Sequence, residues 1–223
     1  KGWIQVQDVS SGFASEVANP KDGDQILDVC GAPGGKSLHL ADLLEQKKGS
    51  GRILSRDVSD KKVELIEENR DRCQFQNIET EVFDGREASP EWEEKADLVM
   101  ADVPCSGLGI LARKNDIKYN ASKERIEELI PLQRQILKNA SKMVKPGGTL
   151  LFSTCTVSKE ENDGNRQWIL EELPFEPEEF YEILEKETNI PDDLEKEARQ
   201  GYLRLLPGIH GTDGFYIAKF RRI

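Results

Sequence analysis

Residues 25–44, QILDVCGAPGGKSLHLADLL, constrain the fold of this 223-residue chain more than any other segment. Ile26, Leu27 and Val29 predict a short buried strand, and Asp28 lies where that strand ends. Three glycines and a proline follow, and they allow a tight turn that a ligand can approach closely. Apolar residues then recur at helical spacing and predict a helix. Because this helix begins directly after the turn, the free N–H groups at its start face the turn. This order of strand, turn and helix predicts a cofactor site at the turn.

The spacing within the turn separates three classes of cofactor site. A P-loop requires G-x-x-x-x-G-K-[ST], but counting back from the GKS of residues 35–37 places Cys30 at the first glycine, so the loop is one residue too short. A dinucleotide fold requires G-x-G-x-x-G, which Ala32 and Pro33 interrupt. The S-adenosylmethionine fold accepts a looser, Asp-led turn because its cofactor carries no phosphate. The turn therefore favours a methyltransferase over a nucleotide hydrolase.

Further along the chain, successive predicted strands end in acidic residues. They are residues 52–57 ending at Asp57, residues 78–84 ending at Asp84 and residues 96–102 ending at Asp102. Because the carboxyl ends of parallel strands share the edge of a sheet where ligands bind, we expect these carboxylates to lie together. Asp57 follows the turn by about the interval at which nucleotide-binding folds place a ribose-binding carboxylate. As an alternative, Asp57 or Ser59 could cap the next helix.

The remaining elements complete an α/β pattern. Thr149–Cys155 predicts a fifth strand that ends in a cysteine, and Tyr202–Leu206 and Phe215–Phe220 predict two more. The loop between the last two is too long for a two-residue turn. Five alternations of strand and helix closed by an antiparallel pair predict a doubly wound, mostly parallel sheet. Together with the Asp-led turn, this favours a Rossmann-like S-adenosylmethionine-dependent methyltransferase fold.

Three local patterns predict where helices begin and end. Residues 13–18 have helical spacing, and Pro20 stops that helix. Pro131 is expected to open the second part of a two-part helix. Ser158 and Glu161 have the spacing of a capping box at the start of another helix.

Charge and cysteine content narrow the class of protein. The formal net charge is −11, but residues 171–197 hold twelve acidic and two basic side chains, so the rest of the chain is near neutral. We interpret that acidic segment as a solvated helical insertion. The four cysteines form no Cys-x-x-Cys pair and the chain has two histidines, so we expect no metal site. With no signal peptide and no apolar run long enough to span a membrane, we expect a cytoplasmic protein without a membrane partner.

Three motifs occur together in one known family. They are the turn Asp28–Lys36, the DVPC of residues 102–105 and the TC of residues 154–155. With these motifs the chain resembles the RNA cytosine-C5 methyltransferases of the Sun/Fmu type, and most of all the bacterial small-subunit (16S) ribosomal RNA enzymes. The resemblance runs from the QDVSS of residues 7–11 to the HGTDGF of residues 210–215. This combination is far more specific than any single motif.

The resemblance implies roles for individual residues. In that family the turn holds S-adenosylmethionine and the strand-end acids complete its site, so the implied cofactor-binding residues are Cys30, Gly31, Ala32, Pro33, Gly34, Gly35, Lys36, Asp57, Asp84 and Asp102. By the same resemblance, Cys155 is the nucleophile and Cys105 assists product release. The implied partner is RNA, ribosomal RNA by the closest likeness, and we expect a monomer.

The resemblance also divides the chain. Residues 1–22 form a lead-in segment with the QD-SS motif, and residues 23–223 form the methyltransferase catalytic domain, with the acidic insertion at about 171–197. Family members usually carry an N-terminal RNA-binding domain before the QD-SS motif. The sequence starts at Lys1 without a methionine, so we expect a fragment that lacks this domain.

The chemistry of cytosine methylation explains why two cysteines are needed. C5 of cytosine is a poor nucleophile, but addition of a thiolate to C6 produces an enamine whose C5 can attack a methyl sulfonium. The C5 proton must then leave and the bond from sulfur to C6 must break, which requires a base or acid nearby. Asp102 could hold either the methionine amine of the cofactor or the polar edge of cytosine. We interpret Cys73 as an inert buried thiol and Cys30 as a packing residue of the turn.

Other functions remain in competition. Transfer RNA or DNA could be the substrate, and a DNA-type enzyme would use Cys105 as its nucleophile and leave Cys155 without a role. A non-catalytic RNA-binding module is a third possibility, although both cysteines and all three strand-end acids are present. One local basic cluster is the best candidate for an RNA contact, and its members are Arg113, Lys114, Lys118, Lys123 and Arg125.

Overall fold

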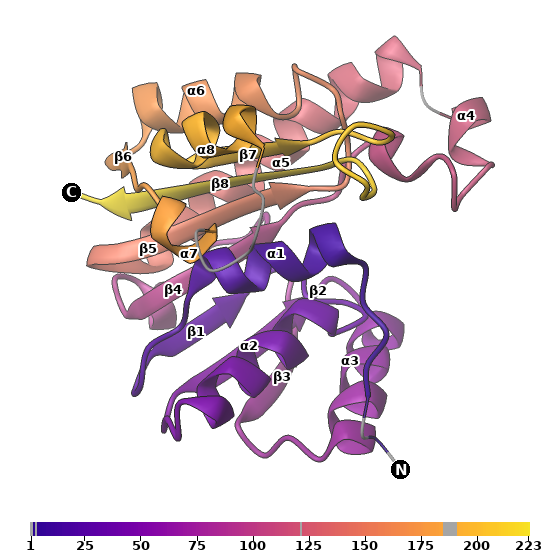
Figure 1. The fold of residues 1–223 in the computed structure, drawn as a ribbon. Coiled ribbons are helices and arrows are strands. Elements are labelled where there is room, and N and C mark those ends of the chain that lie inside the picture. The colour runs from indigo at the N-terminus through magenta and orange to yellow at the C-terminus, as the bar shows by residue number, and fades with distance from the viewer. Residues whose placement is uncertain (1, 3, 121, 185–190) are drawn as a thin grey trace.

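The computed structural model describes residues 2, 4–120, 122–184 and 191–223. Within these residues, eight strands form one mixed sheet in the order β3-β2-β1-β4-β5-β8-β6, and β7 also pairs with β8 (Figure 1). The strands are β1 Gln25–Asp28, β2 Arg52–Asp57, β3 Ile78–Val82, β4 Ala96–Asp102, β5 Val144–Thr154, β6 Phe175–Pro177, β7 Tyr202–Leu205 and β8 Phe215–Arg222. The α-helices are α1 Val9–Ala18, α2 Gly35–Gln46, α3 Asp60–Cys73, α4 Ile117–Asn120, α5 Lys123–Met143, α6 Asp163–Glu172, α7 Tyr181–Leu184 and α8 Asp192–Arg199, and 3₁₀ turns span Pro90–Trp92 and Leu108–Ile110.

The strand pairing brings the motif residues to one edge of the sheet. The first five strands pair in parallel, and β8 runs antiparallel to β5, β6 and β7. The carboxyl ends of β1, β2 and β4 therefore lie side by side, with Asp28, Asp57 and Asp102 as their last residues. The α/β fold class and the doubly wound sheet with an antiparallel end are confirmed.

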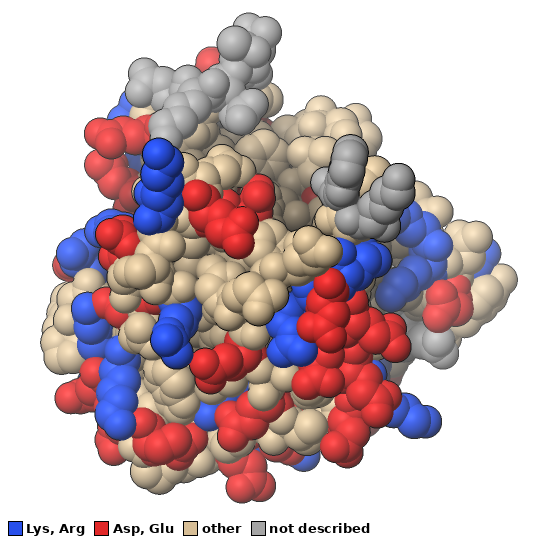
Figure 2. Space-filling model, turned by 90° about the horizontal axis from the view of Figure 1, so that it is seen from below, with Lys and Arg blue, Asp and Glu red and all other residues tan. Residues whose placement is uncertain are grey.

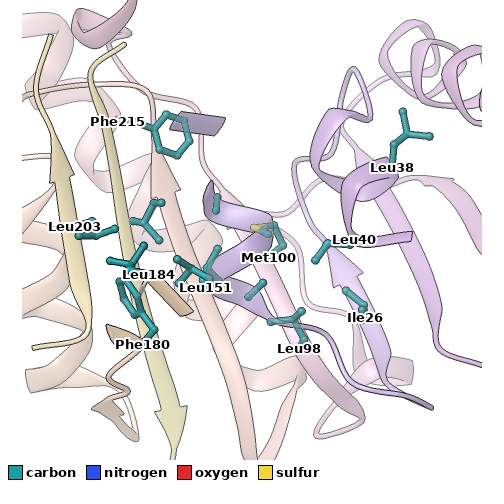
Figure 3. Packing of buried hydrophobic residues seen from close by; sticks show 14 of the residues in the cluster. Ile26, Leu38, Leu40, Leu98, Met100, Leu151, Phe180, Leu184, Leu203 and Phe215 are labelled. Carbon is teal, nitrogen blue, oxygen red and sulfur yellow. The ribbon is translucent and has the colours of Figure 1, made fainter. Parts of the chain in front are cut away.

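Helices cover both faces of the sheet because successive strand residues point to opposite sides. In β1, Ile26 packs in a buried cluster with residues of α1 and α2, whereas Leu27 packs with residues of α5 and α6 (Figure 1). Figure 3 shows the first cluster extending from Leu40 of α2 across the sheet to Leu203 of β7. Val17 of α1 is fully buried in this cluster, so the helix predicted near the start of the chain packs as part of the domain.

Two local helix predictions were wrong. Pro131 lies inside one continuous α5, where its ring is exposed and the missing N–H removes only one bond of a long helix. Helix α6 begins at Asp163 after Asn162, so Glu161 is not the third residue of a capping box. The Glu161 N–H does donate to Ser158 Oγ at 3.3 Å, but the Glu161 side chain bonds to the loop after β4 instead.

The acidic segment was predicted as a solvated helical insertion, and the structure corrects this prediction. The segment supplies β6 at the end of the sheet as well as α7 and α8. Phe175, Phe180, Leu184 and Leu194 are buried, because these apolar residues among the acids face the core. Its residues 185–190 lie outside the described residues. The described part is therefore a structural part of the domain.

The surface carries charges of both signs. Figure 2 shows Lys and Arg side chains interspersed with Asp and Glu on the face seen from below, and the described part of that face has no broad basic area. In the described chain, no helix is both long enough and apolar enough to cross a membrane.

Candidate active site

The turn after β1 is anchored to the end of β2. Gly34 has a φ of 103° and takes the N-cap position of α2, so a residue without a Cβ is favoured there. The Gly31 N–H donates to the Arg56 carbonyl at 2.8 Å. The Ala32 N–H donates to Asp57 Oδ2 at 3.0 Å. The last two residues of β2 therefore determine the shape of the turn.

Asp28 supports the turn from inside the domain. It is 1% exposed, and Ser37 Oγ donates to its Oδ2 at 2.6 Å. Its Oδ1 is buried without a hydrogen-bond partner among the described residues. Burial raises the pKa of Asp28 to about 6, although the bond from Ser37 and the charge of Lys36 act to lower it. Asp28 is thus a buried carboxyl group that supports the turn and leaves one oxygen without a partner among the described residues.

A cavity of about 410 Å³ opens beside the turn at the carboxyl edge of the sheet. Its described lining is Val29, Cys30, Ala32, Asp57, Val58, Lys62, Phe83, Asp84, Gly85, Arg86, Asp102, Pro104, Leu132 and Ile136. The predicted cofactor residues Cys30, Ala32, Asp57, Asp84 and Asp102 are among these. The others, Gly31, Pro33, Gly34, Gly35 and Lys36, form the turn and the start of α2 without lining this cavity.

Two carboxylates of the cavity are paired with cations. Lys62 Nζ lies 2.9 Å from Asp57 Oδ1, and Asp57 does not cap α3, whose N-cap residue is Ser59. Arg86 Nη2 lies 2.5 Å from Asp84 Oδ2, and the hydrogen bonds from Arg86 lower the pKa of Asp84. The cavity thus combines paired carboxylates with apolar side chains such as Phe83 and Ile136 in its lining.

Asp102 and Lys36 lie at the junction between the cavity and the cysteines. Lys36 Nζ is 2.5 Å from Asp102 Oδ2, and Ser153 Oγ donates to Asp102 Oδ1 at 2.8 Å. Burial acts to lower the pKa of Lys36, but the Asp102 carboxylate outweighs burial, so the pKa is raised. The Nζ atom also lies 5.3 Å from the centre of the Phe215 ring. A charged ammonium is thus held beside the end of β5.

The two predicted catalytic cysteines form a pair. Cys105 follows β4 and Cys155 follows β5, and their Sγ atoms are 3.4 Å apart although the residues are 50 positions apart in sequence. Their mutual hydrogen bond lowers the pKa of Cys155 and raises the pKa of Cys105. Burial and the charge of Asp102 raise the pKa of Cys155, and the charge of Lys36 acts to lower it, but the pKa is lowered overall. Cys155 is therefore the thiol of the pair that ionises more readily.

The other two cysteines are in different surroundings. Cys30 lines the cavity, and burial raises its pKa well above the ordinary value for a thiol. Cys73 ends α3 and packs against the apolar core. Both positions fit the interpretation of these residues as unreactive thiols.

The loop that carries Cys105 is packed tightly against the loop before β8. The Gly109 N–H donates to the Cys155 carbonyl at 3.0 Å, and the Gly214 N–H donates to the Gly109 carbonyl at 2.9 Å. A Cβ on Gly109 would lie 2.0 Å from the Gly214 carbonyl oxygen, so glycine is required by this close approach. The segments that carry Cys105 and Cys155 are therefore connected by a backbone hydrogen bond as well as by the contact between their sulfur atoms.

The predicted basic cluster is largely paired with acids. Its described ion pairs are Arg113 with Asp8 and Asp213, Lys123 with Glu127 and Arg125 with Glu128. Arg113 thus joins the QD-SS segment to the loop before β8. These pairs reduce the positive charge that the cluster can offer to a phosphate.

Some site residues were missed by sequence reasoning. Lys62 and Phe83 line the cavity, and the buried pair Gln133 and Glu161 bonds to the segment around Cys105. The position of Lys62 in the first turn of the helix after Asp57 is a weak local signal. Nothing in the local pattern indicates that Glu161 contacts a loop 55 residues earlier.

Other cavities of the described chain are not lined by the thiol pair. A cavity of about 520 Å³ lies at the opposite edge of the sheet, lined by Asp24, Lys145 and Lys219 among others, and neither Cys105 nor Cys155 lines it. No group of His, Cys, Asp and Glu side chains in the described residues is arranged to hold a metal ion.

Comparisons with known proteins agree on one family. A family model described as 16S rRNA methyltransferase RsmB/F matches residues 15–221. A Bacillus subtilis protein named probable ribosomal RNA small subunit methyltransferase B is 39% identical over 99% of this chain and 48% of its own length. Ribosomal RNA small subunit methyltransferase F of Cronobacter sakazakii is 31% identical over 99% of the chain and 45% of its own length. The chain thus spans about half the length of these curated relatives.

Solved structures share the fold of this chain. The crystal structure of NSun6 from Pyrococcus horikoshii with SFG, an analogue of S-adenosylmethionine, is 32% identical and has a TM-score of 0.85 over 100% of this chain and 54% of that one. A SAM-dependent O-methyltransferase from Thermotoga maritima is 16% identical with a TM-score of 0.58, over 98% of this chain and 66% of that one, and this likeness shows the fold alone.

Proposed function

Since the chain belongs to the RsmB/F family of 16S rRNA methyltransferases, we propose that it transfers a methyl group from S-adenosylmethionine to C5 of a cytosine in RNA. The family membership confirms the resemblance seen in the sequence. The substrate class we propose is small-subunit ribosomal RNA, because the curated relatives carry that name.

The thiol pair is the single observation that carries this proposal. Two sulfur atoms 3.4 Å apart have pKa values shifted in opposite directions, at the sheet edge where the cofactor cavity lies. Because any hydrogen-bonded pair of thiols shifts in this way, the support comes from where the pair lies. Cys155 is close to the Lys36 ammonium, at the same edge of the sheet as the cavity, and a nucleophile that must ionise beside a protonated partner needs such surroundings.

The lining of the cavity offers hydrogen-bond acceptors and apolar surface that suit S-adenosylmethionine. Ribose hydroxyls and an ammonium group are hydrogen-bond donors, and Asp57 and Asp84 are acceptors at the ends of neighbouring strands. Phe83 and Ile136 provide an apolar wall for a purine ring. Phosphates fit poorly, because the lysine and the arginine of the lining are already paired with carboxylates. When bound, the cofactor supplies the electrophilic methyl group.

The residues of the chain perform the other steps. The Cys155 thiolate adds to C6 of cytosine, which forms the bond from sulfur to carbon and makes C5 nucleophilic. After C5 has gained the methyl group, its proton leaves to a base, the bond from sulfur to C6 breaks, and the thiolate is restored. Cys105 lies 3.4 Å from the attacking sulfur and is positioned to assist this elimination. Asp102 keeps Lys36 charged, and the Lys36 charge favours the thiolate of Cys155 while the charge of Asp102 itself opposes it.

A DNA-type assignment, with Cys105 as the nucleophile, is less consistent with these surroundings. The bond to Cys155 and burial both raise the pKa of Cys105, so its thiolate is the harder one to form. We therefore assign the nucleophile to Cys155.

The experiment compares Cys155→Ala and Cys105→Ala in the presence of unmodified ribosomal RNA and labelled S-adenosylmethionine. We expect Cys155→Ala to form no covalent RNA adduct on denaturing electrophoresis, and Cys105→Ala to form an adduct that is released slowly. Both variants should still bind the cofactor in a titration, so lost activity can be assigned to the chemistry. A stable adduct with Cys155→Ala alone would reverse the assignment, and failure of the unaltered chain to bind the cofactor would favour a non-catalytic RNA-binding module.

A further inference from the structure

Glu161 is a buried acid that the proposed reaction does not use. It is fully shielded from solvent and does not line the cofactor cavity. Its carboxylate accepts hydrogen bonds from the Ser106 N–H at 2.8 Å, from the Ser106 hydroxyl and from Gln133 Nε2 at 2.8 Å. Among the residues that the structure describes, no lysine, arginine or histidine forms an ion pair with it.

Packing alone does not explain this carboxylate. Moving an ionised acid out of water without a cation is unfavourable, and hydrogen bonds from neutral donors offset only part of the cost. A glutamine would occupy nearly the same volume without a charge. The acid must therefore do something that the amide cannot do.

An ionised carboxylate accepts hydrogen bonds and never donates them, whereas an amide does both. The Ser106 hydroxyl must therefore donate to Glu161, and its lone pair is left to accept from Thr156 Oγ1, which lies 2.7 Å away. Thr156 Oγ1 in turn accepts from the Ser158 N–H at 3.2 Å. The result is a chain of hydrogen bonds with one direction, which ends on the carboxylate.

This chain joins the segments on which the two thiols lie. Ser106 directly follows Cys105, and Thr156 directly follows Cys155. The residue before Cys105 is held as well, because Gln133 Nε2 donates to the Pro104 carbonyl at 2.9 Å. The hydrogen bonds around Glu161 therefore hold Pro104 and Ser106, on either side of Cys105, and Thr156, which follows Cys155.

We propose that Glu161 is a positioning residue that holds the Cys105 and Cys155 thiols within hydrogen-bond distance of each other. This role has a catalytic meaning only if the proposed function holds, because the short separation lets Cys155 attack C6 while Cys105 assists the later elimination. The proposal predicts properties of the two thiols that can be measured in the absence of RNA and cofactor. Replacing the acid by a neutral amide weakens its charge-assisted hydrogen bonds to Ser106 and Gln133 and requires the bond between Ser106 and Thr156 to reverse, so the thiol separation is held less firmly.

The test uses Glu161→Gln and a matched control, Glu160→Gln. Glu160 is the adjacent residue, is exposed and bonds to Ser158 Oγ, so the control removes the same charge without touching Ser106. Two properties are measured by peptide mass spectrometry. The first is the pH midpoint of alkylation of Cys155 by iodoacetamide, and the second is the rate at which the two-electron oxidant diamide forms a Cys105–Cys155 disulfide.

In Glu161→Gln we expect the alkylation midpoint of Cys155 to rise toward that of an ordinary thiol, because the bond from Cys105 is lost part of the time. We expect the disulfide to form roughly a hundredfold more slowly, the loss typical of reacting groups displaced by about 1 Å. Glu160→Gln should behave like the unaltered chain in both assays. Cofactor affinity should be unchanged in both variants, because Glu161 does not line the cofactor cavity.

A folded Glu161→Gln variant with an unaltered alkylation midpoint and disulfide rate would overturn the proposal. If Glu161→Gln does not fold, Ser106→Ala takes its place, because it removes the hydroxyl link to Thr156 while the acid keeps its bonds to the Ser106 N–H and Gln133. Unchanged thiol properties in Ser106→Ala would equally overturn it. Neither assay contains RNA, so a chain that fails to methylate RNA would count against the proposed function and not against this role of Glu161.

Discussion

Asp28 should make the stability of this domain depend on pH in a direction opposite to that of most acids. It is 1% exposed, it accepts one hydrogen bond from Ser37, and its second oxygen is buried without a partner among the described residues. Burial raises its pKa from 3.8 to about 6. The perturbation we consider is Asp28→Asn, which removes the titration and retains the shape of the side chain.

The sign follows from proton binding in the folded and unfolded states. The folded state binds the Asp28 proton more tightly, so this group's contribution to stability is fully present below pH 3.8 and is lost as the pH rises through about 6. A shift of about 2 pKa units at 1.36 kcal/mol per unit corresponds to about 3 kcal/mol. Ionised Asp28 should thus destabilise the domain by about 3 kcal/mol at pH 8 relative to its protonated form.

The assay is urea unfolding of both proteins from pH 4 to pH 8. We expect the free energy of unfolding of the unaltered chain, measured relative to Asp28→Asn, to fall by about 2 kcal/mol over this range, mostly below pH 7, because unfolded Asp28 is already partly ionised at pH 4. The asparagine leaves a buried N–H in place of the unpartnered oxygen, and that cost is the same at every pH. The difference in slope therefore reports the titration of Asp28, whatever the absolute stability of the variant.

The exposed Asp42 of α2 provides the control, since Asp42→Asn removes a carboxylate from the outer side of the same turn-and-helix unit. It should keep the pH dependence of the unaltered chain. Parallel curves for Asp28→Asn and the unaltered chain would refute the reasoning, because they would mean that Asp28 has the same pKa in the folded and unfolded states.

Two further predictions concern the cavity and the thiols. Asp57→Ala should weaken S-adenosylmethionine binding by roughly 1.5–3 kcal/mol for each charged hydrogen bond lost. The substitution also removes the acceptor of the Ala32 N–H, which shapes the turn. Calorimetry that finds unchanged affinity in a folded variant would remove Asp57 from the site. Lys36→Met should raise the pH midpoint of Cys155 alkylation, because it removes a nearby positive charge and leaves Asp102 without its cation. An unaltered midpoint would show that the ammonium does not stabilise the thiolate.

Sequence alone determined the order of the elements and the edge of the sheet at which the site lies. The period of two in strands and of 3.6 in helices is a local property, so β2 and β4 were predicted with the bounds Arg52–Asp57 and Ala96–Asp102 that the structure shows. Parallel strands share one carboxyl edge, and so acids and cysteines at strand ends had to meet there. Where apolar and acidic residues alternate irregularly, as around Phe175, the pattern did not reveal β6.

Only the tertiary structure decided what those residues do to one another. The separation of 3.4 Å between Cys105 and Cys155, the pairing of Lys36 with Asp102 and the bonds from Ser106 to Glu161 all join residues far apart in sequence. A pKa shift depends on burial and on charges within a few ångströms, and neither quantity is encoded in residue spacing. For the same reason Glu161 had the spacing of a helix cap in the sequence, and the folded chain instead buries it against the loop that carries Cys105.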